Sequence, residues 1–143
     1  MTATDHALDL IRTAARAASE KQARNLVAFD VSEQIAITDA FLLASGNNDR
    51  QVKAIVDEIE DKLREAGAKP LRREGERDAR WVLIDYGDIV VHVQHEEERQ
   101  FYALERLWRD CPTIALPADV TGPVEPAAGA TPPAEETGGE SAL

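Results

Sequence analysis

The chain has 143 residues, 43% of them hydrophobic and 30% charged, which is enough for one domain and too few for two ordinary ones. Its formal net charge is −11 and its isoelectric point is near 4.7. Proteins that bind free nucleic acid non-specifically displace counterions from the phosphates with Lys and Arg. A chain with this much negative charge is therefore a poor candidate for that class. The charge favours a basic protein partner or a small ligand.

The single cysteine, Cys111, cannot form an internal disulfide and is compatible with a reducing compartment. The N-terminal residues lack the continuous apolar core of a secretory signal, and no apolar run is long enough to cross a bilayer. We therefore expect a soluble, cytoplasmic protein that makes no membrane contact.

The first part of the chain predicts one helix and two strands. Thr4 or Asp5 can cap a helix over residues 5–22, whose apolar stripe is thin and rich in alanine. Apolar runs then predict strands over 25–31 and 35–44. Because the link between these two runs is short, we expect neighbouring antiparallel strands.

A second helix is predicted over residues 48–66. Asn48 can cap it, with Gln51 at the reciprocal position of a capping box, and Gly67 is placed to end it. The buried stripe consists of Val52, Ile55, Val56, Ile59 and Leu63.

A polar segment follows, in which arginines alternate with acidic residues between Arg72 and Arg80. This mixture is typical of a solvated loop. The alternative is that some of these arginines contact phosphate groups, although the alternating signs weaken it.

Two apolar runs predict strands over 80–85 and 89–94. Asp85-Tyr86-Gly87-Asp88 between them contains the Asp and Gly that a tight turn needs, so the two strands should form an antiparallel hairpin. Neither run has a clearly polar face, which places the hairpin inside a layered α/β domain.

A third helix is predicted over residues 96–109. Three glutamates, residues 96–98, suit the positive end of its dipole. Its apolar face is expected to consist of Phe101, Leu104, Leu107 and Trp108.

The composition changes after Cys111. Residues 112–143 contain six of the seven prolines, five carboxylates, and no aromatic residue, Lys or Arg. Such a segment cannot bury enough apolar area to offset its ordering entropy, so we expect disorder beyond about residue 118, with Ile114 and Leu116 docked on the domain. The whole pattern predicts a single α/β domain over 1–112, with a mixed sheet of at least four strands packed by helices, and a disordered acidic tail over 113–143.

Two stretches carry a family resemblance. The segment LIDYGDIVVHVQHEEERQFYALERLW, together with SGNNDRQVKAIVDEIEDKL upstream, closely resembles the Iojap-related ribosomal silencing factors. The similarity extends over about residues 5–112, and the actinobacterial members come nearest. The resemblance implies a nucleotidyltransferase-like topology without nucleotidyltransferase activity.

The residues of a nucleotidyltransferase site are only partly present. Ser45-Gly46 lies between a predicted strand and a predicted helix, where phosphates can bind, and Asp85 and Asp88 could hold Mg²⁺. However, the order is Ser-Gly, and the two aspartates flank a turn, whereas alternate positions on one strand would point both carboxylates the same way. We therefore expect no phosphoryl-transfer chemistry.

The other reactive side chains have structural interpretations. His92 and His95 are three residues apart on a predicted strand and should project to opposite faces, so a shared metal would require a break in the strand. Cys111 lacks a nearby sequence partner that would identify a nucleophile. We accordingly expect no enzyme activity, no cofactor and no metal site.

The sequence agrees better with a surface that binds a protein partner than with an enzyme active site. Our candidate partner-binding residues are Trp81, Tyr86, Asp88, Glu98 and Tyr102. The tyrosines and acidic side chains, with Tyr86 and Asp88 at the hairpin tip, could form one patch that complements a basic protein surface.

The resemblance implies a translational repressor that acts when nutrients are short. Family members bind ribosomal protein fourteen of the large subunit and obstruct joining of the small subunit. Contact with ribosomal RNA and a homodimer are both compatible with this role. Two alternatives remain, namely a factor for assembly of the large subunit and a Mg²⁺-dependent nucleotidyltransferase-like enzyme.

Overall fold

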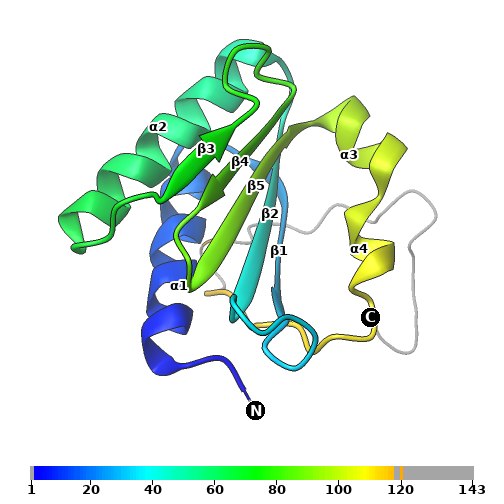
Figure 1. The fold of residues 1–143 in the computed structure, drawn as a ribbon. Coiled ribbons are helices and arrows are strands. Elements are labelled where there is room, and N and C mark those ends of the chain that lie inside the picture. Colours follow the sequence, from blue (N-terminus) through cyan, green and yellow to red (C-terminus); the bar gives the residue numbers. More distant parts are fainter. Residues whose placement is uncertain (1, 118–119, 121–143) are drawn as a thin grey trace.

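The computed structural model describes residues 2–117 and residue 120, which form an α/β structure around one five-stranded sheet (Figure 1). The elements in chain order are α1 (Asp5–Glu20), β1 (Arg24–Asp30), β2 (Ala40–Gly46), α2 (Asp49–Glu65), β3 (Arg72–Glu74), β4 (Trp81–Asp85), β5 (Ile89–His95), α3 (Glu96–Tyr102) and α4 (Leu104–Leu107). Helices α1 and α2 cover one face of the sheet, while α3 and α4 lie on the other side.

The sheet is mixed, with strand order β1-β2-β5-β4-β3. The central pair, β2 and β5, is parallel, and each of the other neighbouring pairs is antiparallel. Both central strands are buried along almost their whole length, which explains why their sequences are apolar without alternation. The expected fold class and the expected hairpin are confirmed.

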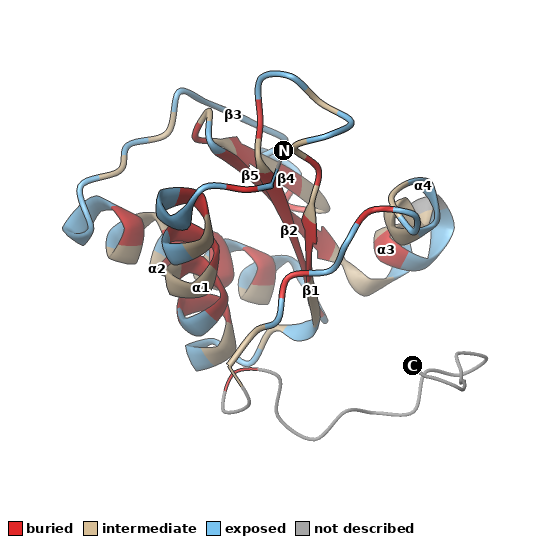
Figure 2. Ribbon diagram, turned by 90° about the horizontal axis from the view of Figure 1, so that it is seen from below, coloured by how far each residue is buried: buried red, intermediate tan, exposed pale blue. Residues whose placement is uncertain are grey.

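The helix face of the sheet, defined as the face packed by α1 and α2, holds the larger core. The Thr4 hydroxyl caps α1 by accepting the Ala7 N–H, and the Asn48 side chain caps α2 by accepting the Gln51 N–H. The Gln51 side chain in turn accepts the Asn47 N–H, so a reciprocal cap forms as predicted, shifted by one residue. Figure 2 shows the buried sides of both helices turned toward the sheet.

The opposite face, here called the second face, carries a smaller apolar cluster. Its buried members are Phe29, Val31, Phe41, Leu43, Val90 and Cys111, with Leu104 and Trp108 packed against them from the C-terminal helices. The chain then returns beside β1, where Thr113 bridges Phe29 and the Ile114 N–H donates to the Ala28 carbonyl. Ile114 is buried and Leu116 partly buried, as predicted, so residues 113–117 pack on the domain and are not part of a disordered tail that begins at residue 113. Of the residues expected to be disordered beyond about residue 118, the structure describes only Val120, which is buried.

Three predicted boundaries were wrong. The strand expected over 35–44 is β2, which begins only at Ala40, because residues 31–39 form a loop closed by the Ile35 N–H donating to the Val31 carbonyl. The polar segment expected as a loop contributes the short edge strand β3. The helix expected over 96–109 is two short helices, separated by Ala103 in a left-handed conformation (φ 47°).

This break also rotates the predicted apolar face. Phe101 and Leu107, expected to be buried, are 81% and 70% exposed. Leu104 and Trp108 do pack on the second face. Within the described residues, no helix combines the length and apolar character required to span a membrane.

Candidate functional site

The junction between β5 and α3 concentrates charged side chains at one end of the sheet. β5 ends at His95, whose Nδ1 accepts the Glu97 N–H at 3.2 Å, so α3 begins without an intervening loop. Arg80 binds the first turn of α3, because its Nη2 donates to Glu97 and its Nε donates to Glu98, each at 3.0 Å. Hydrogen bonds to the two glutamates raise the pKa of Arg80. The junction is therefore an ion-paired corner in which Glu97 remains largely exposed.

Arg99 fastens α3 to the sheet from inside. Its side chain is almost fully buried and donates from Nη1 to the Ser45 hydroxyl and from Nη2 to the Asn25 carbonyl, both at 2.7 Å. The third contact is an ion pair from Nε to Glu105, 2.9 Å away at the start of α4. Burial lowers the pKa of Arg99, and Glu105 opposes that shift. One side chain thus connects β1, β2, α3 and α4.

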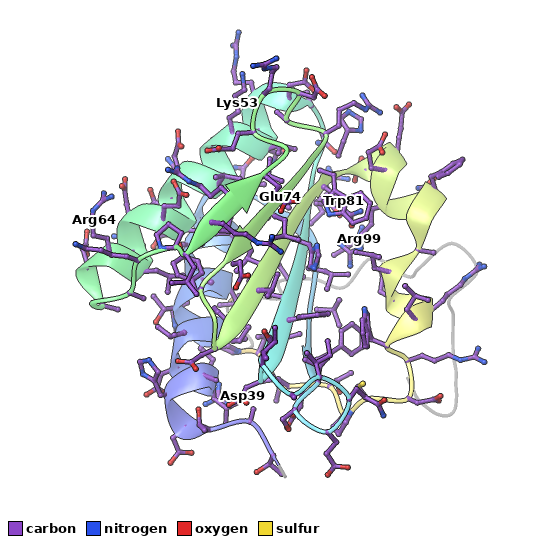
Figure 3. The ribbon with its side chains drawn as sticks, viewed as in Figure 1. Asp39, Lys53, Arg64, Glu74, Trp81 and Arg99 are labelled. Atoms are coloured by element: carbon purple, nitrogen blue, oxygen red, sulfur yellow. The ribbon has the colours of Figure 1, made fainter. Side chains whose placement is uncertain are left out.

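A row of aromatic rings crosses the second face beneath this corner. The Trp81 Nε1–H donates to His92 Nδ1 at 3.1 Å, and the His92 ring meets Phe41 edge-on, with centroids 5.4 Å apart. Phe41 in turn meets the Trp108 ring edge-on at 5.1 Å. Burial lowers the pKa of His92 to about 4, so the imidazole is neutral at pH 7 and its Nδ1 can accept the indole proton. Figure 3 shows Trp81 and Arg99 together between the strands and α3.

Three of the five predicted partner-binding residues lie at this end of the molecule. Trp81 begins β4 and is partly exposed, Glu98 lies on the first turn of α3, and Tyr102 is the last residue of α3. Phe101, also on α3, adds an exposed aromatic ring. We call Trp81, Glu98 and Phe101 the α3 surface, and Tyr102 remains a predicted member of it.

Contrary to the prediction from the sequence, Tyr86 and Asp88 do not join Glu98 in one patch. Tyr86 is only 8% exposed and packs into the core on the helix face, and burial together with the nearby Glu60 carboxylate raises its pKa to about 12. Asp88 is exposed, but it precedes β5, whereas Glu98 follows it. Seven residues of strand place the two carboxylates at opposite ends of the sheet, roughly 20 Å apart.

The carboxylates considered for Mg²⁺ do not converge. Asp85 accepts the Gly87 N–H at 2.8 Å and faces Arg72 at 3.5 Å, while Asp88 lies 3.7 Å from His6 on α1. In the part of the chain that the structure describes, no group of three or more His, Cys, Asp or Glu side chains is arranged to hold a metal ion.

The other side chains considered for catalysis or ligand binding have structural roles. Ser45, expected near a phosphate, bonds to Arg99, and His95 caps α3. Cys111 is buried, and that burial raises the pKa of its thiol, which disfavours the nucleophilic thiolate.

Sequence reasoning missed Arg80 and Arg99, the two residues that build the corner. Arg80 was counted both in the polar segment and as the first residue of the strand predicted over 80–85, and neither assignment gives it a partner on α3. Arg99 stands between a glutamate run and an aromatic residue, and nothing local distinguishes it from a solvent-exposed arginine.

Comparison with known proteins identifies the family. The family model described as "Ribosomal silencing factor during starvation" matches residues 4–142. The chain belongs to the ribosomal silencing factor family. The family member RsfS of Bacillus subtilis (strain 168) is 45% identical over 107 residues, which cover 75% of this chain and 91% of that protein.

A crystal structure from Bacillus halodurans shows the same fold. It aligns with a TM-score of 0.67 at 42% identity and covers 76% of this chain and 98% of that one. A more distant relative in mouse is named "Mitochondrial assembly of ribosomal large subunit protein 1" and is 27% identical over 92 residues, 62% of this chain and 40% of that protein. The family resemblance noted in the sequence is confirmed.

Proposed function

We propose that this protein is a cytoplasmic repressor of translation that binds the large ribosomal subunit and catalyses no reaction. Membership of the ribosomal silencing factor family carries this proposal. The finer proposal is that the protein binds ribosomal protein fourteen and thereby obstructs joining of the small subunit.

The α3 surface is the part of the molecule that we assign to this contact. It combines aromatic side chains, which supply contact area at low entropic cost, with acidic neighbours that complement a basic protein. Arg80 and Arg99 hold α3 in place, so little ordering is required when a partner docks. Tyr86 contributes indirectly, by filling the core beneath the β4–β5 turn.

The repression mechanism is steric and electrostatic. A bound domain occupies space that the approaching small subunit needs. Because the chain carries a formal charge of −11, it also repels RNA on that subunit. The same charge thus favours a basic protein site and opposes an RNA-rich competitor.

Sucrose-gradient sedimentation with purified subunits tests the proposal, with the protein added before the subunits are mixed. We expect co-migration with the large subunit and a dose-dependent loss of joined ribosomes. Phe101→Ser and Glu98→Lys should weaken both effects, whereas Asp61→Lys on the exposed side of α2 serves as a charge-matched control. Failure of the wild-type protein to co-migrate at physiological salt would refute the proposal.

A second candidate function is assembly of the large subunit, which the name of the mouse relative favours. An assembly factor should bind precursor particles in preference to mature subunits and should leave subunit joining intact. Parallel gradients with precursor and mature particles separate the two roles. The position of the protein alone in the gradient also reports whether it forms a homodimer.

A further inference from the structure

The β4–β5 turn, which forms the end of the sheet opposite to α3, is held rigidly by two other segments. From the loop between β1 and β2, the Thr38 hydroxyl donates to the Gly87 carbonyl at 3.0 Å and the Asp39 N–H donates to the Asp88 carbonyl at 2.9 Å. From the segment before β3, the Leu71 N–H donates to the Asp85 carbonyl at 2.7 Å. These long-range bonds give the turn a preformed shape.

Two large apolar side chains adjoin this turn and face solvent. Ile37 is 83% exposed and immediately precedes Thr38, which is bonded to the turn. Leu71 is 73% exposed, and its Cδ1 lies 3.3 Å from the point that a Cβ on Gly87 would occupy. Isolated exposed apolar residues are ordinary, but these two flank one rigid turn, Ile37 on the β2 side and Leu71 on the β3 side, at the end of the sheet opposite to the α3 surface.

The charge around these side chains is negative. The Asp88 side chain is 59% exposed and lies 3.7 Å from the His6 side chain, which is 65% exposed. Asp39 and the exposed Asp5, at the N-terminus of α1, add two further carboxylates at this end. Arg72 is matched by Asp85 at 3.5 Å and Glu74 at 3.2 Å, and the exposed Lys69, two residues before Leu71, adds one positive charge against these three carboxylates.

We propose that Ile37, Leu71 and Asp88 form a second docking surface, here called the turn surface, which binds a basic polypeptide segment. A Lys or Arg of the segment pairs with Asp88, and apolar side chains on either side of that Lys or Arg cover Ile37 and Leu71. The carboxylates repel phosphate, so the occupant is protein and not RNA. This inference rests on the proposed binding to the large subunit and assigns a second protein contact on that particle.

The distance between the two surfaces determines how the second contact contributes to affinity. The α3 surface and the turn surface lie at opposite ends of β5, roughly 20 Å apart, so one short peptide segment does not span both. Two contacts on one particle act as linked sites, and loss of either lowers the overall affinity steeply.

Equilibrium binding of the purified large subunit to labelled full-length protein tests the turn surface. Two variants address it separately, the double substitution Ile37→Ser/Leu71→Ser and the single substitution Asp88→Lys. Because all three side chains are exposed, both variants should melt at the wild-type temperature. We expect each to bind at least tenfold more weakly, while the control Asp61→Lys binds as wild type.

The possible outcomes distinguish this inference from the proposed function. If wild type binds, the α3 variants fail and both turn variants bind normally, the second surface is disproved and the proposed function stands. If wild type itself does not bind, both are disproved.

A photoreactive benzophenone side chain at position 37 then identifies the chemistry of the partner on the large subunit. We expect the cross-link to join a basic ribosomal protein. A cross-link to ribosomal RNA would overturn the inference.

Discussion

Arg99 shows how one residue can decide the position of an entire surface. A guanidinium group carries its charge at any ordinary pH, so burying it is costly unless every donor finds an acceptor. Here a hydroxyl, a carbonyl and a carboxylate supply the acceptors, each from a different element. The residue therefore fixes α3 against β1 and β2 through polar contacts where apolar contacts are few.

The buried His92 predicts that the free energy of unfolding depends on pH. The unfolded chain binds a proton at this histidine near pH 6.5, whereas the folded protein binds it only near pH 4, because the ring is buried. The stabilisation from neutral His92 is thus complete above pH 6.5 and is lost as the pH falls from 6.5 to 4, by about 3 kcal/mol in total. Urea unfolding at several pH values measures this loss.

The variant His92→Phe removes the titrating group and keeps an aromatic ring against Phe41. We expect its free energy of unfolding to depend less steeply on pH between 6.5 and 4. Equal slopes for His92→Phe and wild type would contradict the assignment.

At the scale of elements, the C-terminal helices depend on a backbone conformation that their sequence disfavours. Ala103 separates α3 from α4 with φ at 47°, a left-handed conformation that strains any residue with a Cβ. The strain persists because Leu104 and Trp108 pack on the second face while Arg99 and Glu105 pair across the break.

Replacing Ala103 by Gly should therefore stabilise the protein, by about 0.5–1 kcal/mol, since glycine adopts this conformation without strain. The control is Ala54→Gly in the middle of α2, where φ is helical and the same change should destabilise by about 1 kcal/mol. Thermal unfolding of the two variants should shift in opposite directions. A destabilised Ala103→Gly variant would show that the position tolerates alanine without strain.

This break also explains where prediction from the sequence succeeded and failed. Local signals in the sequence predict the central strands from their apolar runs and predict α1 and α2 from their apolar periodicity and caps. The division at Ala103 depends on distant contacts, so the residues 96–109 alone predict one continuous helix with Phe101 inside. The prediction of the candidate site failed for a similar reason. Tyr86 and Asp88 are only two positions apart in the sequence, but Tyr86 faces the core and Asp88 faces solvent.

At the scale of the whole molecule, the net charge of −11 predicts salt-dependent association with the ribosome. Raising monovalent salt from about 0.1 M to about 1 M shortens the Debye length from about 10 Å to about 3 Å. We expect the association rate constant with the large subunit to fall roughly tenfold or more, with a smaller change in the dissociation rate. Surface-immobilised subunits at constant Mg²⁺ provide the measurement.

Phe101→Ser serves as the comparison, because it removes contact area without changing charge. It should speed dissociation and leave the salt dependence of association unchanged. An association rate that is insensitive to salt in both proteins would mean that the overall charge does not steer binding.

The chain segment that returns beside β1 affects behaviour at high protein concentration. An open strand edge is a template onto which another chain can add, and neither edge of this sheet is left as a long, uncharged open strand. Residues 112–114 bond to β1, and the far edge is β3, which is only three residues long and fully charged. Deleting residues 112–117 would uncover the β1 backbone, so a truncated protein should aggregate through its sheet although its helices remain intact.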